Sequence, residues 1–141
     1  MNYDHLDIDN QLCFALYATS KAVIKNYKPL LDELGITYTQ YITLLVLWKN
    51  DNITVKELGK KLYLDSGTLT PLLKRLESLG VIKRMRDSSD ERNVYVKLTD
   101  EGFSMRDKAS GIPQKMFCST GLSIDEVSDL REKLKALLNN L

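Results

Sequence analysis

Residues 64–102 read LDSGTLTPLLKRLESLGVIKRMRDSSDERNVYVKLTDEG, and their periodicity changes at Gly80. Before this glycine, leucines recur at helical spacing, at positions 69, 72, 73 and 76, which predicts an amphipathic helix that starts after Asp65. After it, segments 81–86 and 93–98 alternate and are rich in β-formers, which is typical of strands. The polar residues between them, DSSDER, predict a β-hairpin with a charged tip.

A short helix is predicted immediately upstream, because Thr54 and Glu57 fit a capping box that begins a helix ending near Leu62. Two helices joined by a tight turn form a helix-turn-helix, and a hairpin directly after them makes the motif winged. In such motifs the first residues of the second helix face base edges in the major groove. The side chains of this helix that we expect to contact DNA are Ser66, Thr68, Thr70, Lys74 and Arg75.

The hairpin tip is flanked by Arg86 and Arg92 and is long enough to enter a minor groove, whose negative potential attracts arginine. The charge distribution agrees with a DNA-binding role. Residues 49–97 hold eleven Lys/Arg and seven Asp/Glu, a net +4, whereas the remainder holds nine and twelve, a net −3. This is a modest basic surface. A small helical domain with a solvated hairpin is the alternative interpretation of the same pattern.

Longer helices are predicted on both sides of this motif. Residues 6–34 carry two apolar stripes at helical spacing, so this helix must be buried on two sides. In a chain this short we expect the second cover to be another subunit. Further helices are predicted over residues 38–50, over 99–116 and after a capping box at Ser123. The last helix carries a coiled-coil-like seam, spaced three and four residues apart, at Val127, Leu130, Leu134, Leu137 and Leu141.

The composition argues against several classes of function. The chain has 141 residues, of which 43% are hydrophobic, which suits one domain, or one compact lobe with an association surface. No apolar run is long enough to span a bilayer, and the first residues lack signal-peptide character, so we expect a cytoplasmic protein with no membrane partner. His5 is the single histidine, and no CxxC or glycine-rich phosphate loop occurs. We therefore expect no metal site, no cofactor and no enzyme activity.

Residues 64–102 resemble the winged helix-turn-helix of MarR-type transcriptional regulators. The segment DERNVYVKLT (90–99) matches their wing signature, Asp-x-Arg followed by a strand that ends in Leu-Thr. The resemblance runs over essentially the whole chain. It implies a mainly α fold with a small β-hairpin wing, residues 37–98 forming the DNA-binding lobe. It also implies a homodimer with interlocked terminal helices (1–36 and 99–141). Each lobe would read half of a pseudo-palindromic double-stranded operator, Asp90 holding the base of the wing and Arg92 reaching the minor groove.

The N-terminal segment NQLCFALY (10–17) resembles the OhrR-type repressors of organic hydroperoxide resistance and the related SarZ-type thiol regulators. In both, a sensor cysteine lies early in the first helix. This resemblance implies that Cys13 is the sensor and that Tyr27 and Tyr38 hydrogen-bond it across the dimer, with Tyr17 nearby. Hydrogen bonds from phenols favour the thiolate, which is the reactive form.

The surroundings of Cys13 leave its chemistry open. Apolar walls at Leu12 and Phe14 would favour organic hydroperoxides over hydrogen peroxide, whereas the neighbouring Asp7 and Asp9 disfavour a negatively charged sulfur. The alternative for Cys13 is a small buried hydrophobic residue without redox function.

The second cysteine, Cys118, lies in the segment GIPQKMFCSTG (111–121). One branch of these repressors uses a C-terminal cysteine, and the resemblance implies that Cys118 of the partner subunit resolves a sulfenic acid on Cys13 by forming a disulfide. The other branch depends on a small external thiol. A buried spacer is the alternative role for Cys118.

The predicted function is a repressor that releases operator DNA when organic hydroperoxide oxidises Cys13, through an intersubunit Cys13–Cys118 disulfide. One alternative is a MarR-type regulator that responds to a small phenolic ligand, or to mixed-disulfide formation at Cys13 alone. A thiol peroxidase is a third hypothesis. It is disfavoured because a basic winged hairpin has no place in such an enzyme.

Overall fold

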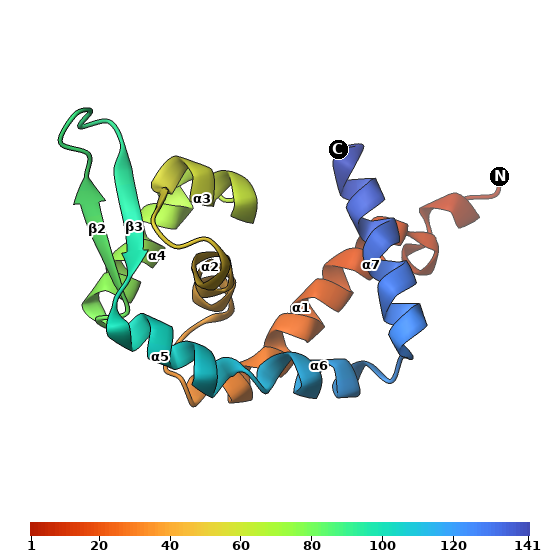
Figure 1. Ribbon diagram of the computed structural model, residues 1–141. Coiled ribbons are helices and arrows are strands. Elements are labelled where there is room, and N and C mark those ends of the chain that lie inside the picture. Colours follow the sequence, from red (N-terminus) through yellow and green to blue (C-terminus); the bar gives the residue numbers. More distant parts are fainter. The chain divides into compact units, whose positions relative to one another are not determined.

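The computed structural model describes residues 1–141 and divides into two compact units, Met1–Ser110 and Gly111–Leu141. The first unit contains two 3₁₀ turns, five α-helices and three short strands, and the second contains two α-helices (Figure 1). This arrangement confirms the predicted mainly α fold with a β-hairpin wing. No helix combines the length and the apolar character needed to cross a membrane.

In chain order the elements of the first unit are η1 (Asp4–Leu6), η2 (Ile8–Asn10), α1 (Leu12–Asp32), α2 (Tyr38–Lys49), β1 (Ile53–Thr54), α3 (Val55–Leu62), α4 (Ser66–Ser78), β2 (Ile82–Arg86), β3 (Val94–Leu98) and α5 (Asp100–Ala109). Those of the second unit are α6 (Ile112–Thr120) and α7 (Ile124–Asn139).

The first long helix begins at Leu12, six residues later than predicted, because local hydrogen bonds hold the preceding residues in two 3₁₀ turns. The Asp7 carboxylate accepts a hydrogen bond from the Asp9 amide at 2.9 Å. The Gln11 side-chain amide donates to the backbone carbonyls of His5 and Asp7, each at 2.8 Å. Short polar side chains that bond the nearby backbone compete with helix formation in this way.

The helix predicted over residues 99–116 is two helices, because the chain breaks at Ser110 and Gly111 between α5 and α6. Pro113 explains the break. Its nitrogen has no proton to donate to the Ala109 carbonyl, and its ring would clash with that carbonyl in a continuous helix. In the first turn of α6 the missing N–H has no cost.

The sheet has three antiparallel strands in the order β1-β3-β2. The hairpin pairs Ile82 with Leu98 at its base and Arg86 with Val94 near its tip. The additional strand, β1, consists of two residues and pairs Ile53 with Val96. A strand this short has no periodicity to detect, which is why the sequence predicted only the hairpin.

The core of the first unit lies where α2, α3, α4 and the sheet meet. Its fully buried side chains are Leu44, Leu47, Leu58, Leu69, Leu73, Leu76, Val81, Ile82 and Val96. The leucines of α4 are those whose spacing predicted the helix. Their burial holds α4 against β2 and α2, so the opposite face of α4 is turned to solvent.

Apolar side chains on two helices remain uncovered. On α1 only Leu31 is buried, whereas Leu12 is 65% and Tyr17 is 59% exposed. In the second unit α7 buries none of its residues, and three residues of its seam, Val127, Leu130 and Leu134, line a groove of about 360 Å³. Exposed apolar surface on this scale marks an association surface.

Candidate nucleic-acid interface and thiol site

The turn between α3 and α4 is short, since α3 ends at Leu62 and α4 begins at Ser66. Asp65 caps α4, because its carboxylate accepts a hydrogen bond of 2.7 Å from the Thr68 amide. The hydrogen bonds from Thr68, first from its amide and then from its hydroxyl, hold the pKa of the Asp65 carboxyl below its ordinary value. The charged cap fixes where α4 begins and therefore which residues lie at its exposed end.

Substitution of Asp65 tests this cap. Asp65→Ala is expected to lower the melting temperature at neutral pH by a few degrees, whereas Asp65→Asn keeps an oxygen acceptor and should lower it less. The pKa of the Asp65 carboxyl is lower in the folded state than in the unfolded state. The stability that the charged cap contributes is therefore present above the ordinary pKa of 3.8 and is lost as the pH falls through the folded-state pKa. In thermal melts, the difference in melting temperature between the wild type and Asp65→Ala should therefore become smaller as the pH is lowered to about 3. A gap that does not change with pH would contradict the charged cap.

The structure places the five candidate DNA contacts of α4 on its exposed side, opposite the four buried leucines. They do not all share one surface. Ser66 and Thr70 line a groove of about 850 Å³ between α3, α4 and the side of the wing that carries Arg84 and Arg92. Lys74 and Arg75 line a shallow depression of about 470 Å³ with Pro71, Ser78 and Leu79.

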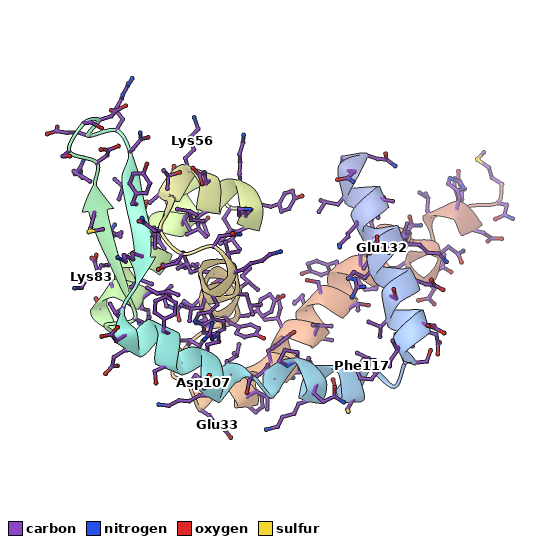
Figure 2. The ribbon with its side chains drawn as sticks, in the orientation of Figure 1. Glu33, Lys56, Lys83, Asp107, Phe117 and Glu132 are labelled. Carbon is purple, nitrogen blue, oxygen red and sulfur yellow. The ribbon has the colours of Figure 1, made fainter.

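Three polar side chains of α3 and its C-terminal turn also line the larger groove and were not among the predicted contacts: Lys56, Lys60 and Tyr63. They are spaced four and three residues apart, so they lie on one side of α3. Figure 2 shows Lys56 pointing away from α3 into solvent. Neither lysine belongs to any ion pair of the chain. The sequence could have predicted these contacts, because the helical spacing that identified the exposed face of α4 also occurs in KELGKKLY (56–63).

Asp90 and Arg92 organise the tip of the wing, so the expectation that Asp90 holds its base is wrong: Asp90 lies in the loop between β2 and β3. The guanidinium donates to both carboxylate oxygens of Asp90, at 3.0 and 3.1 Å, and the Arg92 amide donates to the same carboxylate at 3.1 Å. These hydrogen bonds, led by that of the Arg92 side chain, lower the pKa of Asp90. Arg86 donates to the Glu91 carbonyl at 3.1 Å across the tip. The Arg92 side chain nevertheless remains 89% exposed, so it is oriented by Asp90 without being covered.

A second arginine of the groove, Arg84, is paired with Glu77 of α4. Its guanidinium nitrogens donate to the Glu77 carboxylate at 3.1 and 3.3 Å, and the Arg84 amide donates to it at 3.2 Å. The hydrogen bonds from Arg84 lower the pKa of Glu77. This pair ties the wing to α4, so the two elements are positioned together.

The thiol of Cys13 is free and exposed in the first turn of α1. The residue that precedes this helix, Gln11, makes no side-chain capping bond, so amides of the first turn remain available, and this end of a helix favours negative charge. Tyr17 lies one turn further on the same face, and its ring packs 6.4 Å from that of Phe14. The Lys21 ammonium lies 5.1 Å from the centre of the Tyr17 ring.

The other two candidate tyrosines, Tyr27 and Tyr38, meet each other together with Tyr41. Their ring centres lie 4.9 Å apart, and Tyr41 lies 5.7 Å from Tyr27 and 6.4 Å from Tyr38. Burial, and then the neighbouring Tyr38 and Tyr41, raise the pKa of Tyr27 to about 12, and burial is also the first cause of the raised pKa values of Tyr38 and Tyr41. All three phenols therefore keep their protons at neutral pH and can act as hydrogen-bond donors.

The tyrosine cluster lies far from the thiol of its own chain. Cys13 and Tyr27 are fourteen residues apart on α1, which corresponds to about 21 Å along the helix axis. Within one chain, Tyr17 is therefore the tyrosine that shares a helix turn with Cys13.

The second thiol, that of Cys118, is also free and exposed. It lies near the C-terminal end of α6, where Gly121 adopts a left-handed conformation, and the Gln114 side-chain nitrogen lies 3.7 Å from its sulfur. No group of three or more His, Cys, Asp or Glu side chains is arranged to hold a metal ion.

A helix-turn-helix followed directly by a hairpin, with basic side chains on one surface, defines a winged helix-turn-helix protein. Comparison with known proteins gives the family. Residues 25–109 match the family model described as transcriptional regulator SarA/Rot. The chain is 48% identical over 139 residues to the organic hydroperoxide resistance transcriptional regulator of Bacillus subtilis, covering 99% of this chain and 95% of that protein. The chain therefore belongs to the SarA/Rot family of winged-helix transcriptional regulators, and its recognition as a MarR-type regulator of the OhrR/SarZ branch is confirmed.

Other relatives agree with this assignment. The regulator SarZ of Staphylococcus saprophyticus is 42% identical over 132 residues, which is 94% of this chain and 90% of that protein. The structure of reduced AbfR bound to DNA matches with a TM-score of 0.80 at 37% identity, over 97% of this chain and 95% of that one. Disulfide-formed AbfR matches with a TM-score of 0.67 at 36% identity, over 96% and 95%. AbfR is a protein of Staphylococcus epidermidis.

Proposed function

We propose that this chain is a homodimeric, cytoplasmic repressor that binds a pseudo-palindromic operator and releases it when an organic hydroperoxide oxidises Cys13. It acts as a regulator and not as an enzyme. The observation that carries the proposal is the similarity along 99% of the chain to a regulator of organic hydroperoxide resistance. The exposed thiol at the start of α1 and the winged helix-turn-helix supply the two parts that such a function needs.

Uncovered apolar surface supports the dimer. The exposed side chains of α1, including Leu12 and Ile24, and those of α7, including Leu130 and Leu138, need a partner that excludes water. A two-fold axis would then give two copies of α4, which enter successive major grooves about 34 Å apart. Ser66, Thr68 and Thr70 would lie at base edges or phosphates, with Lys74 and Arg75 beside them. The wing would bring Arg86 and Arg92 to the minor groove, with Asp90 fixing the orientation of Arg92.

The sensing chemistry begins with the Cys13 thiolate. Its sulfur attacks one oxygen of the hydroperoxide and breaks the O–O bond, which leaves a sulfenic acid on Cys13. The departing alkoxide takes a proton from water and becomes the corresponding alcohol. Within its own chain Cys13 has Tyr17 beside it. Tyr27 and Tyr38 of the partner subunit would supply protonated phenols as donors, which agrees with their raised pKa values and with the separation of about 21 Å within one chain. Those donors would stabilise the reactive thiolate.

The second step forms a disulfide. The thiol of Cys118 of the partner subunit attacks the sulfenic sulfur of Cys13, and water leaves. The bond requires the two Cα atoms to come within about 7 Å. The resulting displacement of the dimerisation helices would change the spacing of the two α4 helices and remove DNA contacts. AbfR, which has been solved both in a reduced DNA-bound form and in a disulfide form, is a relative in which both states exist.

Non-reducing electrophoresis tests the disulfide. One equivalent of cumene hydroperoxide is expected to shift wild-type protein to twice the monomer mass, and reductant should reverse the shift. Cys118→Ser is the matched control and should remain a monomer on the gel. A wild-type chain that stays monomeric and gains the mass of a small thiol at Cys13 would replace the disulfide with mixed-disulfide sensing. If neither cysteine changes in mass, the redox function itself is wrong.

A further inference from the structure

The C-terminal end of α3 has a residue that the local backbone does not favour. At this end the Leu64 amide donates to the Gly59 carbonyl at 3.0 Å, and the Tyr63 amide donates to the Lys60 carbonyl at 3.4 Å. These two bonds form a Schellman motif, in which the residue after the last helical position adopts a left-handed conformation. That residue is Tyr63, with a φ of 56°. Glycine is the usual residue there, because a Cβ is strained in this conformation.

Two other helices of the chain end in the same motif with glycine at the left-handed position. After α1, the Ile36 amide donates to Leu31 and the Gly35 amide to Asp32, and the left-handed residue is Gly35 with a φ of 71°. After α4, the same pair of bonds surrounds Gly80, which has a φ of 78°. Three helices thus end in one hydrogen-bond pattern, and only the helix that leads into the helix-turn-helix turn has a side chain at this position.

Burial within the chain does not offset the strain at Tyr63. Its side chain is 71% exposed, so the ring gains little from packing against the rest of the protein. A large aromatic side chain at a strained and exposed position is expected to have its partner outside the chain.

The surroundings of Tyr63 indicate the chemistry of that partner. Tyr63 lines the groove of about 850 Å³ with Lys56, Lys60, Ser66 and Arg92, which are cationic or hydroxyl side chains. Such a set of donors suits phosphate oxygens, and phosphate contacts of this kind position a protein on the DNA duplex. The Tyr63 hydroxyl can add a hydrogen-bond donor to this set.

We propose that Tyr63 is a DNA-backbone contact whose hydroxyl donates a hydrogen bond to a phosphate beside the recognition helix α4. The proposal rests on the proposed DNA-binding function and extends it to a residue outside α4 and the wing. The left-handed backbone at the end of α3 directs this side chain out of the turn, and the contact to phosphate compensates for the strain when DNA is bound.

Two variants separate this role from a structural one. Tyr63→Phe keeps the ring and the backbone and removes the hydroxyl, and Tyr63→Gly relieves the strained conformation and removes the side chain. Asn52→Gly is the matched control, because Asn52 is the other non-glycine residue with a positive φ, at 63°, and it lies outside the groove lining. Fluorescence anisotropy would measure affinity for a duplex of about 40 base pairs selected on the wild type, and for a random-sequence duplex of equal length.

Both Tyr63 variants are expected to bind about tenfold or more weakly, since a hydrogen bond to a charged group is lost in each subunit. Affinity should fall by the same factor for both duplexes, because a phosphate contact carries no sequence information. The dependence of log affinity on log salt should keep its slope, since no charge is removed. The melting temperature of Tyr63→Gly should stay within about 3 °C of the wild type or rise. Asn52→Gly should bind as the wild type does.

Two results would overturn the proposal. One is wild-type affinity in Tyr63→Phe. The other is a fall in the melting temperature of Tyr63→Gly that accompanies its loss of affinity, which would make the side chain structural. Failure of the proposed function gives a different result, because the wild type itself would then bind neither duplex.

Discussion

Replacing Cys13 by serine should leave operator binding intact and abolish the response to organic hydroperoxide. The substitution removes one sulfur from an exposed position in the first turn of α1, so the fold and the affinity of the reduced protein should remain within about threefold of the wild type. Serine cannot form a sulfenic acid, so no disulfide can follow. In the wild type, one equivalent of cumene hydroperoxide is expected to reduce affinity by about 100-fold, the upper range of coupling between two sites.

The measurement is the anisotropy of a labelled operator duplex, titrated with each protein before and after the oxidant. Cys118→Ser is the informative control, because it keeps the sensor and lacks the resolving thiol. It should form the sulfenic acid yet release DNA less completely than the wild type. Release of DNA by oxidised Cys13→Ser would show that another group senses the oxidant, and the assignment of Cys13 would then be wrong.

Replacing Gly102 by alanine should destabilise the protein strongly, although alanine is the better helix former by about 1 kcal/mol. A Cβ at position 102 would lie 2.2 Å from the Val81 carbonyl oxygen and 2.9 Å from a methyl carbon of Leu98. The Val81 carbonyl also accepts the Thr99 amide at 3.1 Å, so it cannot move without loss of this bond. Trp48 donates to the Gly102 carbonyl at 2.9 Å and opposes a shift of α5.

We expect Gly102→Ala to lower the free energy of unfolding by roughly 2–4 kcal/mol, because overpacking against backbone is not relieved by rotation of a side chain. DNA affinity should fall as well, since Val81 joins α4 to the wing. Gly111→Ala is the control. A Cβ there meets no atom within 4 Å, and its φ of −85° suits alanine, so its stability should change by less than about 1 kcal/mol. Chemical denaturation would measure the free energy of unfolding of Gly102→Ala and Gly111→Ala. Equal values for the two variants would contradict the packing described around Gly102.

The central part of the fold was predictable because its signals are local. The leucine spacing of α4 and the alternation of β2 and β3 each follow from a periodicity within one segment. Of the two predicted capping boxes, the one formed by Ser123 and Glu126 at the start of α7 was confirmed. At the start of α3 the Thr54 hydroxyl accepts from the Glu57 amide, but the reciprocal bond that would complete a capping box is absent. By contrast, β1 has two residues and depends on pairing with Val96, which is more than forty residues away.

The candidate site was predictable only in part. Hydroxyl and basic side chains at the start of α4 could be recognised from their position in the motif, whereas the pairing of Arg84 with Glu77 depends on how the wing folds against α4. Tyr41 joins Tyr27 and Tyr38 through the packing of α1 on α2, which no spacing within one helix indicates. The strain at Tyr63 is a property of backbone geometry and has no sequence signal apart from the absence of glycine.

The proposed function depends on control of DNA binding by one thiol, and a single titration tests this control. Wild-type protein would be bound to its labelled operator duplex under reducing conditions, treated with one equivalent of cumene hydroperoxide, and then treated with dithiothreitol, with anisotropy followed throughout. We expect binding, release and recovery in that order. A complex that stays intact after intact-mass analysis has shown oxidation of Cys13 would contradict control of DNA binding by this thiol.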